Sequence, residues 1–486
     1  MSVRGAAIWS MGAQYVAFTL NFVASVIVAR YFLGPEEAGL FSLAFSAAMM
    51  LAVLQDFGLT RYIAGEREMT PERIRACFTV SLLFALAVGL SIVASAWPVA
   101  AFYEDGRLLP LMLVIAGSYL LVPLAIVPTA LVQRDLDFKS MFIVTVGAAL
   151  TNAAVTLILA AMGYSAMALA WGTVGQQAAR ALLAMWRAGW PSPVPLTLKG
   201  ARPVVGFGTG ASILAVSGAI GTRSPELVIG RLLDFAAVGL YGRAMGLAGQ
   251  LRGLLTGAVA GVFYPAFARL RDQGEDLAPP YVRVVACYSA VTWPAMAFLA
   301  ASSLPLVLML YGPTWAGVAP LLVWIALSEM IFTALPLHME LPLLLGKMKR
   351  LVWLNLADTA ASITMLLAFA FWGLEAAAAS RVAYGVLWFG IYAGWMQRLI
   401  GFSWVALLEV HAKSLAGTIA TVTPLLLAYA FWKPPAEMDF ASLASLAAAG
   451  CLAWLACIFA VRHPIRHEVG EVAATLLPRP LRLRRS

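Results

Sequence analysis

The feature that most constrains this chain is a long series of apolar runs, each about 20 residues in length, separated by short polar loops. A helix of about 20 apolar residues crosses the roughly 30 Å hydrocarbon core of a bilayer. A soluble fold has too little interior to bury so many runs, and the composition agrees, since 62% of the residues are hydrophobic and 12% are charged. We therefore predict an all-α polytopic membrane protein.

Fourteen runs have the length of a transmembrane helix. Six in the first half are expected at 6–32, 38–54, 77–102, 108–132, 141–162 and 164–186. Six in the second half are expected at 204–230, 238–264, 284–310, 318–345, 351–372 and 374–396, and two more follow at 415–432 and 441–461. The first run is too long for a cleavable signal peptide and is interpreted as the first span.

The loop charges test this count independently, because cytoplasmic loops of membrane proteins are rich in Lys and Arg. With a cytoplasmic N-terminus, the inner loops and tails hold 24 of the 33 Lys and Arg residues, whereas the outer loops hold four. Every alternation has the expected sign, so both termini are predicted to be cytoplasmic. The net charge of +9 then reflects membrane orientation, and no nucleic-acid partner is expected. The four cysteines form no CxxC pair, so no metal site is predicted.

An internal repeat divides the chain. The stretch 28–34 followed by Gly39-Leu40-Phe41 parallels 229–233 followed by Gly239-Leu240-Tyr241. Six spans lie between the two copies, and an even number returns the chain to the same side, so the halves are parallel repeats. The predicted organisation is a six-helix lobe (1–190), a proline-rich cytoplasmic linker (191–203), a second six-helix lobe (204–398), two extra helices (412–461) and a basic cytoplasmic tail (462–486).

Several motifs resemble those of a known family. Asp56-Phe57-Gly58-Leu59 looks like the DFGL signature of bacterial polysaccharide exporters, and 229–231 with 239–244 resembles their IGR…GLYSRA pattern. Residues 264–270 (YPAFARL) resemble the family's FPALSRL motif, and 311–315 (YGPTW) its loop before the tenth span. The chain thus resembles lipid-linked oligosaccharide flippases of the Wzx kind, whose superfamily also contains lipid II flippases and multidrug and toxic compound extrusion transporters.

The resemblance implies a transporter and no enzyme. Its expected cargo is an undecaprenyl-diphosphate-linked oligosaccharide for exopolysaccharide or lipopolysaccharide biosynthesis, moved from the inner to the outer leaflet of the bacterial cytoplasmic membrane. Alternating access is expected to be coupled to a gradient of H⁺ or Na⁺, with no other cofactor. A polysaccharide polymerase and glycosyltransferases of the same pathway are the expected protein partners. The sequence departs from the family pattern at Gly242, where the pattern has Ser, and at Glu226, where an Asp is usual.

Five basic residues remain outside the loops: Arg180, Arg223, Arg243, Arg252 and Arg381. An arginine fork donates two parallel hydrogen bonds to a phosphate and stays charged at any relevant pH, so the four in the second half are candidates for binding the diphosphate. Helix rise places Arg223, Arg243 and Arg381 about 7–11 Å below the outer boundary and Arg252 about 21 Å below it. Arg180 lies near an inner helix end and is expected to snorkel toward water.

Ion pairing is the alternative role for these arginines, with Arg223 paired to Glu226 on one helix face and Arg252 paired to Asp358. The candidate coupling carboxylates are Asp358, Glu329 and Glu226, because a coupling group must exchange a proton or bind a cation inside the membrane.

Gln14 and Asn21 are seven residues apart, so they share a face of the first span and are candidates for lining the cavity. Hydrogen bonding between helices is the alternative role for this pair.

Two rival functions remain at this point. A drug exporter of the same superfamily would carry lipophilic cations and would need an acidic cavity, whereas spans seven, eight and twelve are basic. A membrane polymerase or ligase of the same pathway would need a large outer loop for catalysis, and the outer loops here are short.

Overall fold

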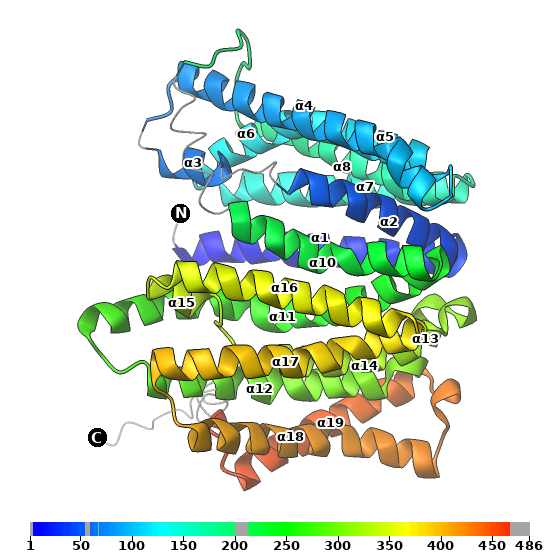
Figure 1. The fold of residues 1–486 in the computed structure, drawn as a ribbon, viewed down its shortest axis with the longest axis vertical. Coiled ribbons are helices and arrows are strands. Elements are labelled where there is room, and N and C mark those ends of the chain that lie inside the picture. The colour runs from blue at the N-terminus through cyan, green and yellow to red at the C-terminus, as the bar shows by residue number, and fades with distance from the viewer. Residues whose placement is uncertain (1–2, 54–58, 67, 200–211, 467–486) are drawn as a thin grey trace, which may run out of the picture. The chain divides into compact units, whose positions relative to one another are not determined.

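A computed structural model describes residues 3–53, 59–66, 68–199 and 212–466. The secondary structure of these residues is helical, and they form no strand (Figure 1). A helix, or a pair of helices, lies at each of the fourteen predicted segments, although 204–211 of the seventh segment lie outside the described residues. The all-α class is confirmed.

The chain divides into two compact units. Unit 1 comprises Met1–Gly242, Leu310–Trp315 and Asn355–Leu374, and unit 2 comprises Arg243–Met309, Ala316–Leu354 and Glu375–Ser486. Helices wholly in unit 1 are α1 (Val3–Tyr31), α2 (Pro35–Ala52), α3 (Leu59–Gly65), α4 (Pro71–Phe102), α5 (Leu108–Leu120), α6 (Val122–Arg134), α7 (Phe138–Ala161), α8 (Ala166–Arg187) and α10 (Ser212–Leu232). The division into lobes, linker and extra helices made from the sequence stays a prediction.

The remaining helices belong to unit 2 or pass from one unit to the other. They are α11 (Phe235–Gln273), α12 (Ala278–Ala301), α13 (Ser303–Tyr311), α14 (Val318–Phe332), α15 (Glu340–Leu344), α16 (Met348–Ala370), α17 (Leu374–Ile400), α18 (Trp404–Phe431) and α19 (Phe440–Ala460). Two short 3₁₀ turns lie at Pro313–Trp315 and Pro435–Glu437.

Seven of the described helices are long and apolar enough to cross a membrane: α1 from Trp9 onward, α4, α7, α12, α16, α18 and α19. The pair α5 and α6, bent by 40° at Leu121, makes an eighth span if counted as one. The helices that hold the five interior arginines, α8, α10, α11 and α17, are not among the seven. Charged and polar side chains lower the mean hydropathy of these helices.

Small residues allow close packing of α7 and α8 in unit 1. A Cβ added to Gly172 of α8 would overlap the Thr156 hydroxyl of α7. Nearby, the Asn152 side-chain amide donates to Gln176 Oε1 at 3.0 Å. In a lipid bilayer the hydrophobic effect does not drive helices together, because the lipid tails are as apolar as the side chains. Close packing of small residues and hydrogen bonds between helices stabilise the contact instead.

The repeated glycines meet at one crossing within unit 1. A Cβ on Gly39 of α2 would clash with the carbonyl group of Phe235, and one on Gly239 of α11 would clash with the carbonyl group of Pro35. Because backbone lies directly against backbone, neither position has room for a side chain. The two copies of the sequence repeat therefore place equivalent glycines against each other.

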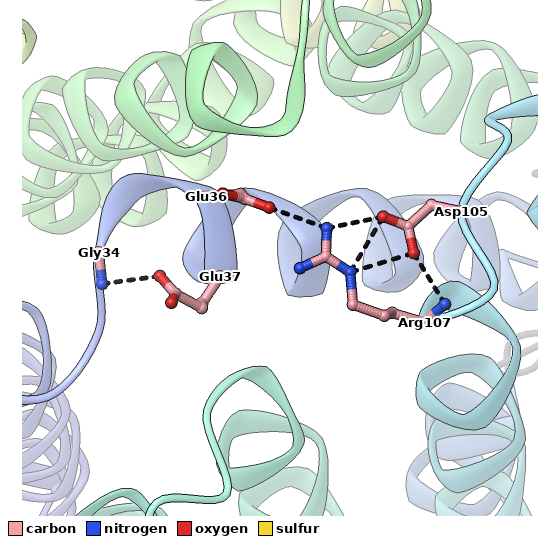
Figure 2. Close-up of polar contacts among 5 residues, drawn as sticks. All are labelled: Gly34, Glu36, Glu37, Asp105 and Arg107. Carbon is pink, nitrogen blue, oxygen red and sulfur yellow. Dashed lines mark hydrogen bonds and ion pairs between the residues drawn. The ribbon is translucent and has the colours of Figure 1, made fainter.

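A polar network holds the starts of α2 and α5 together (Figure 2). Arg107 binds Asp105 through two nitrogens and also pairs with Glu36 at 2.8 Å. The Gly34 amide donates to Glu37 Oε2 at 2.9 Å, which caps α2. The charged hydrogen bonds from Arg107 lower the pKa of Asp105.

A buried polar network in unit 2 joins α12, α18 and the segment after α19. Ser289 of α12 lies 2.8 Å from Ser414 of α18, and Ser414 lies 3.1 Å from His463 Nε2. The His463 Nδ1 accepts a hydrogen bond from the Ile465 amide, and the ring is fully buried. The two C-terminal helices are thus fixed to α12 by hydrogen bonds as well as by apolar contacts.

Candidate functional site

The strongest charged cluster inside the described helices centres on Glu329 of α14. Its Oε2 lies 3.0 Å from Nη1 of Arg252 on α11, and its Oε1 lies 3.0 Å from Nη2 of Arg381 on α17. Glu329 is only 2% exposed. All three residues belong to unit 2, so one buried carboxylate joins two of the four arginines that the sequence singled out.

The two arginines are held differently. Arg381 donates to Glu329 Oε1 and to the Ser328 hydroxyl at 3.3 Å, and its guanidinium lies 5.4 Å from the centre of the Phe332 ring. Its side chain is 19% exposed, whereas that of Arg252 is 46% exposed. The Arg252 contact is an ion pair without the alignment of a hydrogen bond, since Glu329 Oε2 has no hydrogen-bond partner among the described residues. Arg381 is therefore fixed, and Arg252 is the more accessible of the two.

Two guanidinium groups and one carboxylate leave this cluster with a net charge of +1. A buried carboxylate without a partner would be costly, so Arg381 stabilises Glu329 and Glu329 in turn holds both arginines in place. Helix rise had placed Arg252 and Arg381 about 10–14 Å apart in depth, and the long arginine side chains close that gap by converging on one carboxylate.

The other two candidate arginines lie elsewhere. The guanidinium of Arg223 on α10 is 5.7 Å from the centre of the Phe45 ring on α2, within unit 1. Arg243 is partly buried on α11, nine residues before Arg252. Arg223 therefore belongs to unit 1, whereas Arg243, Arg252 and Arg381 belong to unit 2.

Two of the candidate coupling acids are buried in unit 1. Asp358 of α16 is 7% exposed and Glu226 of α10 is 8% exposed. Ser217 of α10 lies 3.1 Å from Thr359 of α16, which fixes the register of these helices. Asp358 is next to that contact, whereas Glu226 is nine residues further along α10, or about 13 Å by helix rise. The two acids therefore lie at different depths.

Asp358 has a second buried polar residue near it on α16. Asn355 of α16 is 6% exposed, and its Oδ1 has no hydrogen-bond partner among the described residues. Gln14 and Asn21 are both exposed on α1, and their role in lining a cavity stays a prediction. No group of three or more His, Cys, Asp or Glu residues in the described ranges has the arrangement of a metal site.

A cavity in unit 1 was not expected from the sequence. It has a volume of about 580 Å³ and lies among α2, α3, α5, α6 and α8. Arg180 lines it, together with Gln176 and Gln177. The expectation that Arg180 snorkels toward water at a helix end stays a prediction, and the structure adds that the side chain lies on a cavity wall. The pair Gln176-Gln177, one turn before Arg180, was the available signal.

The sequence profile of a family described as "Polysaccharide biosynthesis protein" matches residues 27–320, which is more than half of the chain. The chain belongs to this family. The succinoglycan biosynthesis transport protein ExoT of Rhizobium meliloti is 25% identical over 429 residues, covering 86% of this chain and 83% of that protein. The lipopolysaccharide biosynthesis protein WzxC of Escherichia coli is 22% identical over 316 residues, covering 65% of this chain and 64% of WzxC.

Two solved transporter structures have a fold similar to that of this chain. A lipid II flippase, MurJ, in an inward closed conformation aligns over 95% of this chain and 100% of its own, with a TM-score of 0.74 and 14% identity. An inward-facing multidrug resistance transporter of the MATE family aligns over 79% of this chain and 94% of its own, with a TM-score of 0.59 and 15% identity. At these identities the likeness shows the fold alone. The resemblance to polysaccharide exporters expected from the motifs is confirmed.

The structure explains part of the family motifs. Trp315 of the 311–315 motif is fully buried, and its Nε1 donates to the Ala29 carbonyl group at 2.9 Å, which joins that loop to α1 within unit 1. Gly239 lies at the glycine crossing described above. Residues 56–58 of the Asp56-Phe57-Gly58-Leu59 motif and the tail from 467 onward lie outside the described residues.

Proposed function

We propose that this protein is a flippase for lipid-linked oligosaccharides in polysaccharide biosynthesis. The cargo is an undecaprenyl-diphosphate-linked repeat unit, moved from the cytoplasmic to the outer leaflet of the bacterial cytoplasmic membrane by alternating access, with both termini cytoplasmic. Family membership and the two transport and biosynthesis proteins among its relatives support this class of function.

The observation that carries the proposal is the cluster of Arg252, Glu329 and Arg381. A lipid-linked diphosphate needs a cationic group inside the membrane region, and a cationic drug would need the opposite charge. The fixed Arg381 and the buried Glu329 hold the cluster, while Arg252 is exposed enough to exchange its carboxylate contact for a phosphate oxygen. Release of the diphosphate then restores the ion pair between Arg252 and Glu329.

The driving force is proposed to be an ion gradient sensed by buried carboxylates. Asp358 is the preferred group, because Asn355 and the Ser217–Thr359 contact supply neutral oxygen atoms near it. These are the hard donors that a sodium ion prefers, and a buried carboxylate can instead take up a proton. Glu226, about 13 Å away along α10, is the second candidate.

The experiment is a leaflet assay in a deletion strain of the source bacterium. Diphosphate-linked oligosaccharides are extracted after spheroplasts have been treated with a glycosidase that cannot cross the membrane. Complete units that resist the glycosidase in the deletion strain, and become sensitive when the gene is restored, support the flippase.

Variants assign the site within that assay. R252A and R381A should leave units protected, whereas R398A should restore sensitivity, because Arg398 is exposed at the end of α17. Units that reach the outer leaflet in the deletion strain contradict the proposal and favour a polymerase or ligase. Full transfer by R252A and R381A at normal protein levels contradicts the site assignment.

A further inference from the structure

The cavity in unit 1 combines one cation with many hydrogen-bond acceptors. Arg180 is partly buried on its wall, seven residues and about 10 Å before the end of α8. Among the described residues, Arg180 makes no ion pair and no hydrogen bond. A guanidinium withdrawn from bulk water without a carboxylate is unfavourable unless a ligand or water supplies acceptors, so this position calls for an anion.

Three hydroxyl groups on the cavity wall already donate hydrogen bonds to backbone carbonyl groups. Ser118 donates to the Ile115 carbonyl group, Thr129 to that of Ala125, and Thr173 to that of Ala170, in each case within its own helix. Each hydroxyl oxygen keeps lone pairs, so these three groups act toward the cavity as acceptors. They match a ligand that brings hydroxyl hydrogens.

The two glutamines add to this pattern. Gln176 Oε1 accepts from Asn152 at 3.0 Å, so its amide nitrogen is left as a donor. The Oε1 of Gln177 is buried and has no hydrogen-bond partner among the described residues. A buried acceptor without a partner is costly in an isolated protein and is relieved when a ligand hydroxyl donates to it.

The size of the cavity suits a small polar ligand. A volume of about 580 Å³ lies within the usual range for small-molecule sites. Apolar side chains such as Phe45 and Met49 form most of the wall, so the polar groups occupy a smaller part of it. Arg223, whose guanidinium lies against the Phe45 ring, places a second positive charge behind that wall.

We propose that this cavity binds a sugar that carries an oxyanion, as a second cargo site distinct from the Arg252–Glu329–Arg381 cluster. Arg180 binds the phosphate or carboxylate oxygens, and Gln177 with the hydroxyl oxygens of Ser118, Thr129 and Thr173 accepts from the sugar hydroxyls. The inference rests on the proposed flippase function, and it narrows the cargo to an oligosaccharide with an acidic sugar or a glycosyl phosphate.

The test is isothermal titration calorimetry on the full chain in lipid nanodiscs. The probes are glucose 1-phosphate, glucuronate and neutral glucose. Wild type should bind one of the two anionic sugars at least tenfold more tightly than glucose. R180Q should bind that sugar at least tenfold more weakly than wild type. Q177L should also weaken binding of the same sugar, and its thermal unfolding should match that of wild type, which shows that the fold is intact. R398Q is the matched control, because it removes an exposed arginine of the same charge.

The outcomes separate the two proposals. Tighter binding of glucose 1-phosphate assigns the site to a glycosyl phosphate, and tighter binding of glucuronate assigns it to an acidic sugar. Equal binding by R180Q and wild type, or no binding of either anion by wild type, overturns the cavity assignment. If the leaflet assay still shows transfer in that case, the flippase stands and only the second site is lost.

Discussion

Glu329 is 2% exposed, and its carboxylate forms ion pairs with two guanidinium groups of unit 2. Its partners differ in exposure, because Arg381 is 19% exposed and Arg252 is 46% exposed, so their removal should not be equivalent. The residue-scale predictions follow from this asymmetry.

Replacing Glu329 with Gln should destabilise the protein more than replacing Arg252 with Gln. The change leaves two guanidinium groups without their shared carboxylate, and we expect a loss of about 3–5 kcal/mol, as for other buried ion pairs that lose one partner. R381Q should lie between the two, because Arg381 is the less exposed arginine. Thermal unfolding of purified protein, followed by tryptophan fluorescence, measures the order. A variant E329Q as stable as wild type would contradict the structural role of this carboxylate.

Replacing Asp358 with Asn should uncouple transport from the ion gradient. The amide keeps the size and a hydrogen-bonding oxygen but cannot exchange a proton or neutralise a cation. In proteoliposomes that hold lipid-linked oligosaccharide, an imposed H⁺ or Na⁺ gradient should accelerate wild type and leave D358N unchanged, a difference of about tenfold within the usual range of coupling free energies. E226Q is the comparison variant, because Glu226 is the second candidate coupling acid. Equal acceleration of wild type and D358N would exclude Asp358 as the coupling carboxylate.

At the scale of the helices, the closest contact is the crossing of α2 and α11 at Gly39 and Gly239. G39A and G239A should each destabilise the protein by about 1–3 kcal/mol or more, because the added methyl group meets a backbone carbonyl that cannot rotate away. The control is G246A on α11, where an added Cβ meets nothing within 4 Å. There Ala should be neutral or stabilising by up to about 1 kcal/mol, since it favours a helix over Gly. The midpoint of thermal unfolding distinguishes these outcomes.

The second element-scale contact is the buried hydrogen-bond network at His463, which should weaken in acid. Burial lowers the pKa of His463 to about 4 from an ordinary value of 6.5. The folded protein therefore keeps the ring neutral, whereas the unfolded chain takes up a proton below pH 6.5. Stability from this group is fully present above about pH 6.5 and is lost as the pH falls toward 4, by an amount on the order of 3 kcal/mol.

The measurement is thermal unfolding between pH 7.5 and 4.5, with H463N as the comparison. Other groups titrate in the same window, so only the difference between the two proteins reports His463. The wild-type curve should fall more steeply than that of H463N. Parallel curves would mean that the ring is not held neutral by its contacts with Ser414 and Ile465.

At the scale of the whole molecule, the orientation predicted from loop charge is testable by labelling. Single cysteines at Gly106 and Gln273, in a background without the four native cysteines, lie in loops of opposite predicted side. A membrane-impermeant maleimide should label G106C in intact spheroplasts and label Q273C only after lysis. An added Cβ at Gly106 meets nothing within 4 Å, so the substitution itself should be tolerated. Labelling of both positions in intact cells would contradict the predicted topology.

The sequence by itself determined the membrane class, the position of fourteen helical segments and the family. These features depend on hydrophobicity, helix length and short motifs, and each is local in the chain. The sequence also selected the interior arginines and acids, because any charge within an apolar run is conspicuous. It placed them by helix rise alone, which gives depth along one helix but neither the direction of a side chain nor the neighbouring helix.

Tertiary structure decided which of these groups meet. Arg252 and Arg381 converge on Glu329 from three helices, and the equivalent glycines of the two repeats face each other at Gly39 and Gly239. Arg180 lies near a helix end, and only the structure shows that it shares a cavity formed by five helices with Gln177. Pairing between distant segments depends on helix rotation and packing of small residues, and no local pattern of residues encodes either quantity.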